Sequence, residues 1–262
     1  MTRELQTLHA IENEMRALPG HLGFYYKNLV TGQSFSVRAD ESYAAASVIK
    51  LPLYLHILAE ADKGRLCMDD VLTVKNEDKV PICGALTLFT DEIRADIATL
   101  CRLMISLSDN TATNVLIRHL GIPAIAQGFE KMGLTVTRLA RCLFDMEANA
   151  RGLSNFICPQ EIGMLLEKLY KNEFVSPEVC RTALDTLMLQ QIGHKLNGKL
   201  CERLPLAHKT GEDTGISNDV GVVYAAQPFV ICFAGHDTDV YPWEDLMRRA
   251  AYDLALAVGT SL

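Results

Sequence analysis

Three short strings, which follow one another in a fixed order, constrain this chain more than any other feature of its sequence. They are Ser-Val-Ile-Lys at 47–50, Ser-Asp-Asn at 108–110 and Lys-Thr-Gly at 209–211. If Ser47 opens a helix, Lys50 lies one turn later on the same face, where its amine can reach the serine hydroxyl. A serine hydroxyl becomes a strong nucleophile when a neighbouring base takes its proton, and lysine can be that base once burial or nearby positive charge lowers its pKa. We therefore expect Ser47 and Lys50 to form a nucleophile and base pair, with Lys209 as the nearby charge.

Taken one at a time, the strings have ordinary structural explanations. A serine at the start of a helix is a common N-cap, Ser-Asp-Asn is typical of a helix-capping loop, and Lys-Thr-Gly fits a strand that turns on a glycine. A chain of 262 residues contains about one Ser-x-x-Lys by chance, whereas each tripeptide is rare. The occurrence of all three in one chain indicates a common site.

The trio resembles the signature of class A β-lactamases and penicillin-binding proteins. The resemblance implies an α+β fold, with an antiparallel sheet flanked by N- and C-terminal helices and an inserted all-helical lobe. It also implies a serine hydrolase of the β-lactamase type, which cleaves a β-lactam amide, or a related amide or ester, through an acyl-enzyme on Ser47. In such an enzyme Lys50 would be the proton acceptor or relay, and Ser108 would hand a proton to the leaving nitrogen or oxygen.

The same resemblance implies the substrate-binding residues. Asn110 would contact both the relay lysine and the substrate, and Lys209 and Thr210 would anchor the substrate carboxylate. The backbone N–H groups of Ser47 and Glu212 would form the oxyanion hole, with Glu212 present for its main chain only. No cofactor and no metal are implied.

The residue that activates water for deacylation is expected in the segment 144–152. Class A β-lactamases carry an E-x-x-L-N string in a loop between the second and third motifs, but here Glu147 is followed four residues on by Arg151 instead of asparagine. We expect Glu147 to be either the water-activating base or a loop residue that is ion-paired with Arg151 or Arg141. Asp145 is a weaker substitute as the base.

The region after the third motif departs from the family pattern in its charges. Many class A enzymes add an arginine on the next strand to hold the β-lactam carboxylate, whereas this chain has no lysine or arginine between Lys209 and Arg248. We therefore expect a weak anion site, in which Lys209 and Thr210 hold an anion alone or the substrate is not strongly anionic at that end. Otherwise the helical segment must supply a cation, from Arg102, Arg138, Arg141 or Arg151.

These departures leave two alternative functions open. A penicillin-binding peptidase, or an esterase acting on small neutral esters, would acylate Ser47 and then deacylate slowly, giving a burst of one product per protein. A non-catalytic binding or sensor domain on the same scaffold would form no covalent adduct with any acyl donor, although an intact set of motif residues argues against it.

Hydrophobic periodicity predicts the order of the elements. We expect an N-terminal helix over 5–18, a helical middle from about 47 to 191, and a final helix entered at Pro242. Strands are expected at 23–30, 34–38, 204–209, 217–226 and 229–234. Residues 1–42 and 203–262 would form an α/β lobe and residues 43–202 an all-helical lobe, in one compact unit with the active site in the cleft.

Composition excludes several kinds of partner. A net charge of −7 argues against nucleic acid. No apolar run approaches the roughly 20 residues of a membrane span, and the N-terminus lacks the apolar region of a signal peptide, so the chain as written is expected to be cytoplasmic unless an export signal has been removed. The eight cysteines form no C-x-x-C and are expected to be reduced and mostly buried. The expected partner is a small-molecule acyl substrate, and the sequence does not determine the oligomeric state.

Overall fold

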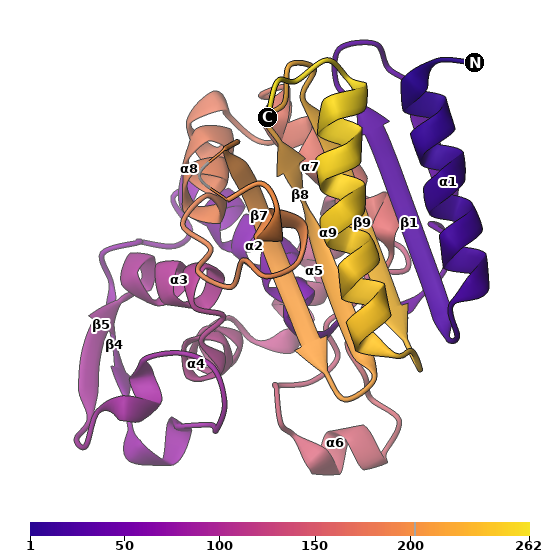
Figure 1. Cartoon of the computed structure of the whole chain (residues 1–262). Coiled ribbons are helices and arrows are strands. Elements are labelled where there is room, and N and C mark those ends of the chain that lie inside the picture. Colours follow the sequence, from indigo (N-terminus) through magenta and orange to yellow (C-terminus); the bar gives the residue numbers. More distant parts are fainter. Residues whose placement is uncertain (202) are drawn as a thin grey trace.

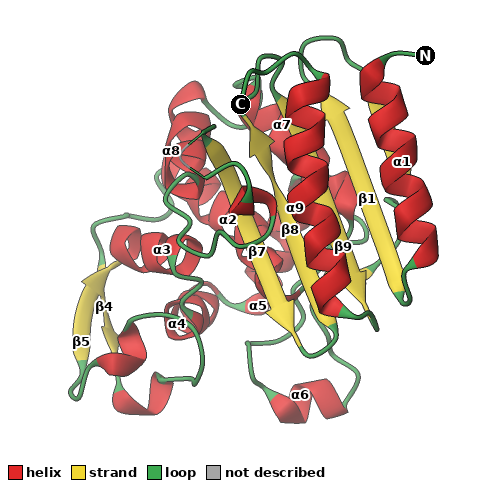
Figure 2. Ribbon diagram, in the orientation of Figure 1, coloured by secondary structure: helices red, strands yellow, loops and turns green. Residues whose placement is uncertain are grey.

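The two ends of the chain build one five-stranded antiparallel sheet (Figures 1 and 2). The computed structural model describes residues 1–201 and 203–262, so residue 202, where the helical segment is predicted to end, lies outside the described residues. The strands run in the order β2-β1-β9-β8-β7, and every neighbouring pair is antiparallel. Their bounds are β1 (His21–Asn28), β2 (Ser34–Val37), β7 (Leu206–Asp213), β8 (Ile216–Val223) and β9 (Phe229–His236).

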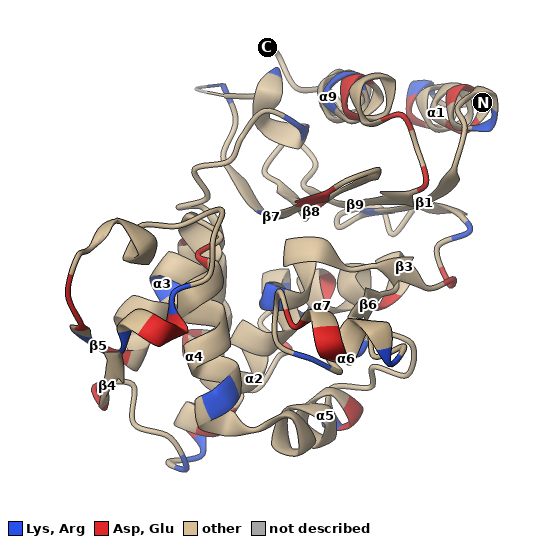
Figure 3. Ribbon diagram, turned by 90° about the horizontal axis from the view of Figure 1, so that it is seen from below, with Lys and Arg blue, Asp and Glu red and all other residues tan. Residues whose placement is uncertain are grey.

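Two helices cover one face of this sheet, as the view along the strands shows (Figure 3). Both are amphipathic: α1 (Arg3–Ala17) buries Leu8, Ile11 and Met15, and α9 (Val240–Ala257) buries a comparable stripe. Trp243 of α9 packs edge-on against Phe233 of the sheet and donates its indole N–H to the Ser217 carbonyl at 2.9 Å. The predicted terminal helices and the predicted strands of the sheet are therefore confirmed.

A helical lobe packs on the other face of the sheet (Figure 3). Its central helix, α2 (Lys50–Asp62), is buried nearly all round, as expected of a helix that is apolar on every side. The surrounding helices are α3 (Ile97–Ser106), α4 (Asn110–Leu120), α5 (Ile122–Lys131), α6 (Met146–Ala150), α7 (Pro159–Tyr170) and α8 (Pro177–Leu187). None of the helices in the described residues combines the length and the apolar character that crossing a membrane requires.

The lobe also contains short elements that the periodicity does not predict. Two-residue strands pair as β3 (Tyr43–Ala44) with β6 (Phe156–Ile157), and a longer ladder joins β4 (Val71–Val74) to β5 (Ile93–Asp96). Short 3₁₀ turns complete the chain: η1 (Ala46–Ile49), η2 (Asn76–Asp78), η3 (Leu86–Leu88) and η4 (Leu196–Gly198). The cysteines are less buried than expected, because Cys67, Cys83 and Cys201 are exposed and Cys142 is only partly covered.

The sheet and the lobe meet where β7 passes the head of α2. Gly211 of β7 lies so close to this turn that a Cβ atom there would be 3.0 Å from the Ala45 oxygen and 3.0 Å from the amide nitrogens of Ser47 and Val48. Backbone atoms on both sides leave no flexible group that can move away. The absence of a side chain at Gly211 therefore allows the third motif to lie against the first.

We expect Gly211→Ala to lower the free energy of unfolding by about 1 to 3 kcal/mol, because the added methyl group forces these two segments apart. Urea unfolding would measure the change. Gly193→Ala is the matched control: its Cβ would meet only the Asn197 side chain, at 3.3 Å or more, so its cost should stay within about 0.5 kcal/mol. Equal losses in the two variants would show that the close approach is not tight.

Candidate active site

Ser47 lies at the head of α2, in the 3₁₀ turn η1 that runs directly into this helix. The turn is entered through Ala46, whose φ of 42° is in the left-handed region. The amide N–H of Lys50 bonds back to the Ser47 carbonyl, which closes the turn. Ser47 is partly exposed whereas Lys50 is fully buried, so solvent reaches the serine but not the lysine.

The Lys50 amine makes three hydrogen bonds inside the protein. It donates to the Ser108 carbonyl at 2.7 Å, to Ser108 Oγ at 3.0 Å and to Asn110 Oδ1 at 2.7 Å. Burial, and then the positive charge of Lys209, hold the pKa of Lys50 well below its usual range. In the described part of the chain none of its hydrogen bonds goes to Ser47, so the expected direct contact with the nucleophile is replaced here by contact with Ser108.

Ser108 lies between two ammonium groups. Its Oγ accepts hydrogen bonds from Lys50 Nζ at 3.0 Å and from Lys209 Nζ at 3.1 Å. A hydroxyl has two lone pairs and one proton, so these two donors leave the proton of Ser108 available for another acceptor. The backbone φ of 54° at this buried residue directs the side chain between the two lysines.

The rest of the second motif holds this strained serine in place. Asp109 caps α4, accepting from the Ala112 amide at 2.9 Å with one oxygen, and with the other it accepts from the amides of Ala85 and Leu86 at 2.8 and 2.9 Å. Asn110 donates to the Ile82 carbonyl at 2.6 Å while its oxygen receives the Lys50 bond. The second motif therefore ties the segment 82–86 to the head of α4 and fixes the lysine at the same time.

The third motif adds the second cation. Lys209 is fully buried on β7, and its ammonium also bonds the Thr210 carbonyl at 2.9 Å. Burial, followed by the charge of Lys195, lowers the pKa of Lys209 to about 7. The hydroxyl of Thr210 makes no hydrogen bond among the described residues, so it remains available beside Lys209.

Lys195 is a further cation that no motif in the sequence indicates. It is fully buried, and its amine bonds the Gly211 carbonyl and Ser217 Oγ, both at 3.3 Å, and the Asn218 carbonyl at 3.1 Å. It also forms an ion pair of 2.9 Å with Glu212 Oε1. Lys195 thus places a second cation near Lys209, and it precedes the third motif in sequence instead of following it; that Lys209 and Thr210 hold a substrate anion alone stays a prediction. The expectation that Glu212 contributes only its main chain is wrong, since its carboxylate holds Lys195.

A loop between residues 138 and 156 lies across the lobe. Arg138 and Phe156 close it with mutual backbone hydrogen bonds of 2.9 and 3.0 Å. Inside the loop, Leu143 is anchored to α4: its amide donates to Asn114 Oδ1 at 2.8 Å, and Asn114 Nδ2 donates to its carbonyl at 2.9 Å. Asn114 follows Asn110 by one helical turn, so Leu143 is held beside the site. The four-residue spacing of these asparagines is the only sequence signal for this anchor.

Glu147 lies further along the same loop, on the short helix α6. Its side chain is exposed and, within the described residues, forms neither a hydrogen bond nor an ion pair, so the expected pairing with Arg141 or Arg151 is wrong. Asp145 is occupied as the N-cap of α6, accepting from the Ala148 amide at 2.8 Å. The role of Glu147 as the water-activating base stays a prediction.

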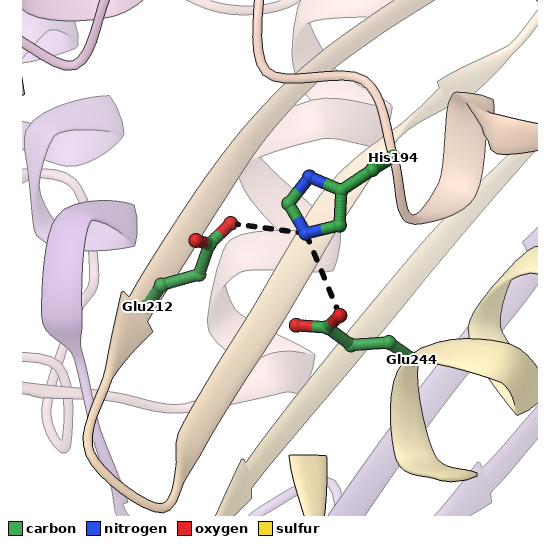
Figure 4. A group of neighbouring side chains, drawn as sticks. All are labelled: His194, Glu212 and Glu244. Atoms are coloured by element: carbon green, nitrogen blue, oxygen red, sulfur yellow. Dashed lines mark ion pairs between the residues drawn. The ribbon is translucent and has the colours of Figure 1, made fainter. Parts of the chain in front are cut away.

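A histidine and two carboxylates near Lys195 are side chains of the kinds that bind metal ions. His194, Glu212 and Glu244 place one ligand atom each within 4.8 Å of one another (Figure 4). Both carboxylates already have partners, because Lys195 pairs with Glu212 and Ser217 Oγ donates to Glu244 at 2.8 Å. We assign no metal to this group.

Comparisons with known proteins show which family this chain belongs to. A β-lactamase of Rhodobacter capsulatus is 29% identical over 266 residues, covering 97% of this chain and 86% of that protein. A solved β-lactamase of Sphaerobacter thermophilus is 26% identical with a TM-score of 0.88, covering 97% of each chain. A leucine-to-glutamate mutant of PBP-A, solved as an acyl-enzyme complex with penicillin-G, is 27% identical with a TM-score of 0.87, covering 97% of this chain and 96% of that one. The model of the β-lactamase enzyme family matches residues 6–256, and the chain therefore belongs to this family.

Proposed function

We propose that this protein is a serine hydrolase of the β-lactamase type, which opens a β-lactam or a related small amide or ester through an acyl-enzyme on Ser47. The observation that carries the proposal is the Ser108 hydroxyl, which accepts hydrogen bonds from both Lys50 and Lys209 beside the partly exposed Ser47. The family of the chain supports it, as do relatives described as β-lactamases and the penicillin-G acyl-enzyme of the PBP-A mutant.

Acylation follows from the proton positions at this site. Ser47 Oγ attacks the carbonyl carbon while Lys50 takes its proton. Burial and the charge of Lys209 lower the pKa of Lys50 and so favour its neutral form, in which the amine keeps two of its three donated hydrogen bonds and has a lone pair for the proton. Ser108 gives its own proton to the leaving nitrogen and regains one from Lys50, so the relay returns to its starting state. For an amide, one C–O bond forms and one C–N bond breaks. The net result is that Ser47 loses one proton and the leaving nitrogen gains one.

Two further groups of residues stabilise and orient the substrate. The backbone N–H groups of Ser47 and Glu212 would donate to the developing oxyanion. Gly211, which precedes Glu212, lies close to the Ser47 amide, and this supports the assignment. Asn110 would orient the substrate amide, and Lys209 with Thr210 would hold its carboxylate.

A second candidate, acylation with slow release, is favoured by one observation. The loop residue that α4 anchors beside the site is Leu143, which has no carboxylate, whereas Glu147 lies on the exposed helix α6. Deacylation needs a base that activates water. In this candidate the protein would behave as a penicillin-binding peptidase or an esterase.

The nucleophile can be tested by intact-protein mass spectrometry after mixing with a penicillin and with an aryl ester. The parent should gain the mass of one acyl group, and Ser47→Ala should gain none, because it lacks the attacking oxygen and the other hydroxyl beside the lysines, that of Ser108, is buried. Thermal unfolding of the variant should stay close to that of the parent, since removing a hydroxyl from a cleft costs little stability. Persistent labelling of Ser47→Ala would remove the proposal.

The pH dependence should differ between anionic and neutral substrates. Lys209 binds a carboxylate in its charged form, so kcat/KM for a β-lactam free acid should fall as the pH rises through about 7. The neutral methyl ester should lack this fall. For both substrates kcat/KM should rise with pH as Lys50 loses its proton, which its lowered pKa shifts to a lower pH than for an ordinary lysine. The same alkaline fall for both substrates would show that Lys209 does not recognise the carboxylate.

The two loop positions separate the leading function from slow release. If Glu147 is the base, Glu147→Gln should leave acylation nearly unchanged and slow deacylation by about 10² to 10⁴. Adduct lifetime, followed by mass spectrometry, measures this effect. Deacylation at the parent rate in Glu147→Gln, together with faster release in Leu143→Glu, would instead support the slow-release candidate.

A further inference from the structure

The ion pair between Lys195 and Glu212 joins a buried cation to an accessible anion. The side chain of Lys195 is 0% exposed, whereas that of Glu212 is 45% exposed. The other partners of the ammonium are neutral and lie at 3.1 Å or more, so Glu212 is its shortest contact and its only charged one among the described residues. Glu212 therefore covers Lys195 from the solvent side.

Lys195 belongs to the same end of the cleft as Lys209. Its charge is the second largest cause of the lowered pKa of Lys209, after burial. Its amine also bonds the carbonyl of Gly211, the last residue of the third motif. An anion that approaches Lys209 thus enters the field of both ammonium groups and of the Glu212 carboxylate.

Glu212 has a second neighbour that carries a positive charge when it is protonated. His194 Nε2 lies 3.5 Å from Glu212 Oε1 and 3.5 Å from Glu244 Oε2, as Figure 4 shows. The pKa of His194 is raised, first by its hydrogen bond with Glu244 and then, after an opposing effect of burial, by the charge of Glu212. If Glu212 moved a short way from Lys195 toward His194, the carboxylates of Glu212 and Glu244 would both lie near the imidazole. The ammonium of Lys195 would then lose its only charged partner among the described residues.

We propose that the Glu212 carboxylate competes with the carboxylate of the acyl donor for Lys195, and so sets the preference between anionic and neutral substrates. The inference rests on the proposed function. Because Glu212 is partly exposed, its ion pair with Lys195 is weak enough for a substrate carboxylate to displace Glu212. Breaking that ion pair costs free energy, so the net free energy of binding an anionic substrate is less favourable. Removing the charge of Glu212 should therefore improve recognition of anionic substrates specifically.

The test compares kcat/KM for a β-lactam free acid with that for its neutral methyl ester, in the parent, in Glu212→Gln and in Glu244→Gln. The two variants remove the same charge beside the same histidine, but only Glu212 contacts Lys195. The acid-to-ester ratio should rise about three- to fivefold in Glu212→Gln, as expected at the upper end of the range for an ion pair with one partly exposed partner. In Glu244→Gln the ratio should change by less than about twofold.

An unchanged or lower ratio in Glu212→Gln would overturn the inference, and so would equal increases in the two variants, since these indicate a general effect of net charge. Intact-protein mass spectrometry on the same samples separates this failure from failure of the proposed function. If Ser47 of the parent is acylated by neither substrate, the proposed function fails first. If Ser47 is acylated and the ratios do not move, only the role of Glu212 fails.

Discussion

Burial of positive charge is the constraint on which the rest of this site depends. Lys50, Lys195 and Lys209 are all fully buried, and a buried ammonium group is very unfavourable unless acceptors surround it. The fold supplies those acceptors from three places: the junction of α3 and α4, the strands β7 and β8, and the Glu212 carboxylate. For Lys50 and Lys209 the residual cost appears as a lowered pKa, which favours the neutral amine that a base requires.

The two layers of the fold explain how these segments are held together. The head of α2 and the head of α4 belong to the helical lobe, whereas β7 is the edge strand of the sheet, and the site lies where they meet. Local strain accompanies this arrangement, because Ala46 and Ser108 both adopt left-handed backbone angles that cost on the order of 1 to 3 kcal/mol each. Such strain persists only where surrounding contacts over-determine the conformation, and at Ser108 the hydrogen bonds of Asp109 and Asn110 supply them.

The sequence predicts those parts of the structure that have a period or a motif. The order of the three motifs was enough to predict one site for Ser47, Lys50, Ser108 and Lys209, and in the structure Ser108 contacts both Lys50 and Lys209. Lys195 and Leu143 have neither signal, since irregular loops bring them to the site through contacts with β7 and α4. Closeness in sequence did not predict the ion pair expected for Glu147. Arg151 follows Glu147 by one turn, but it is the residue that ends the short helix α6, and the two side chains do not pair in the described part of the chain.

In the proposed function the same lysines serve both catalysis and recognition, so the two properties would be physically coupled. The charge of Lys195 depresses the pKa of Lys209, and the charge of Lys209 depresses that of Lys50. An anion bound at Lys209 or Lys195 offsets part of this repulsion and favours the protonated forms, which strengthens binding but leaves less of Lys50 in the neutral form that takes a proton. Glu212 already neutralises part of the charge of Lys195. An anionic substrate that displaces Glu212 replaces one negative charge with another, so the proton affinity of the lysines changes less than it would without Glu212. In such a site a change that favours anionic substrates also changes the proton affinity of the catalytic base.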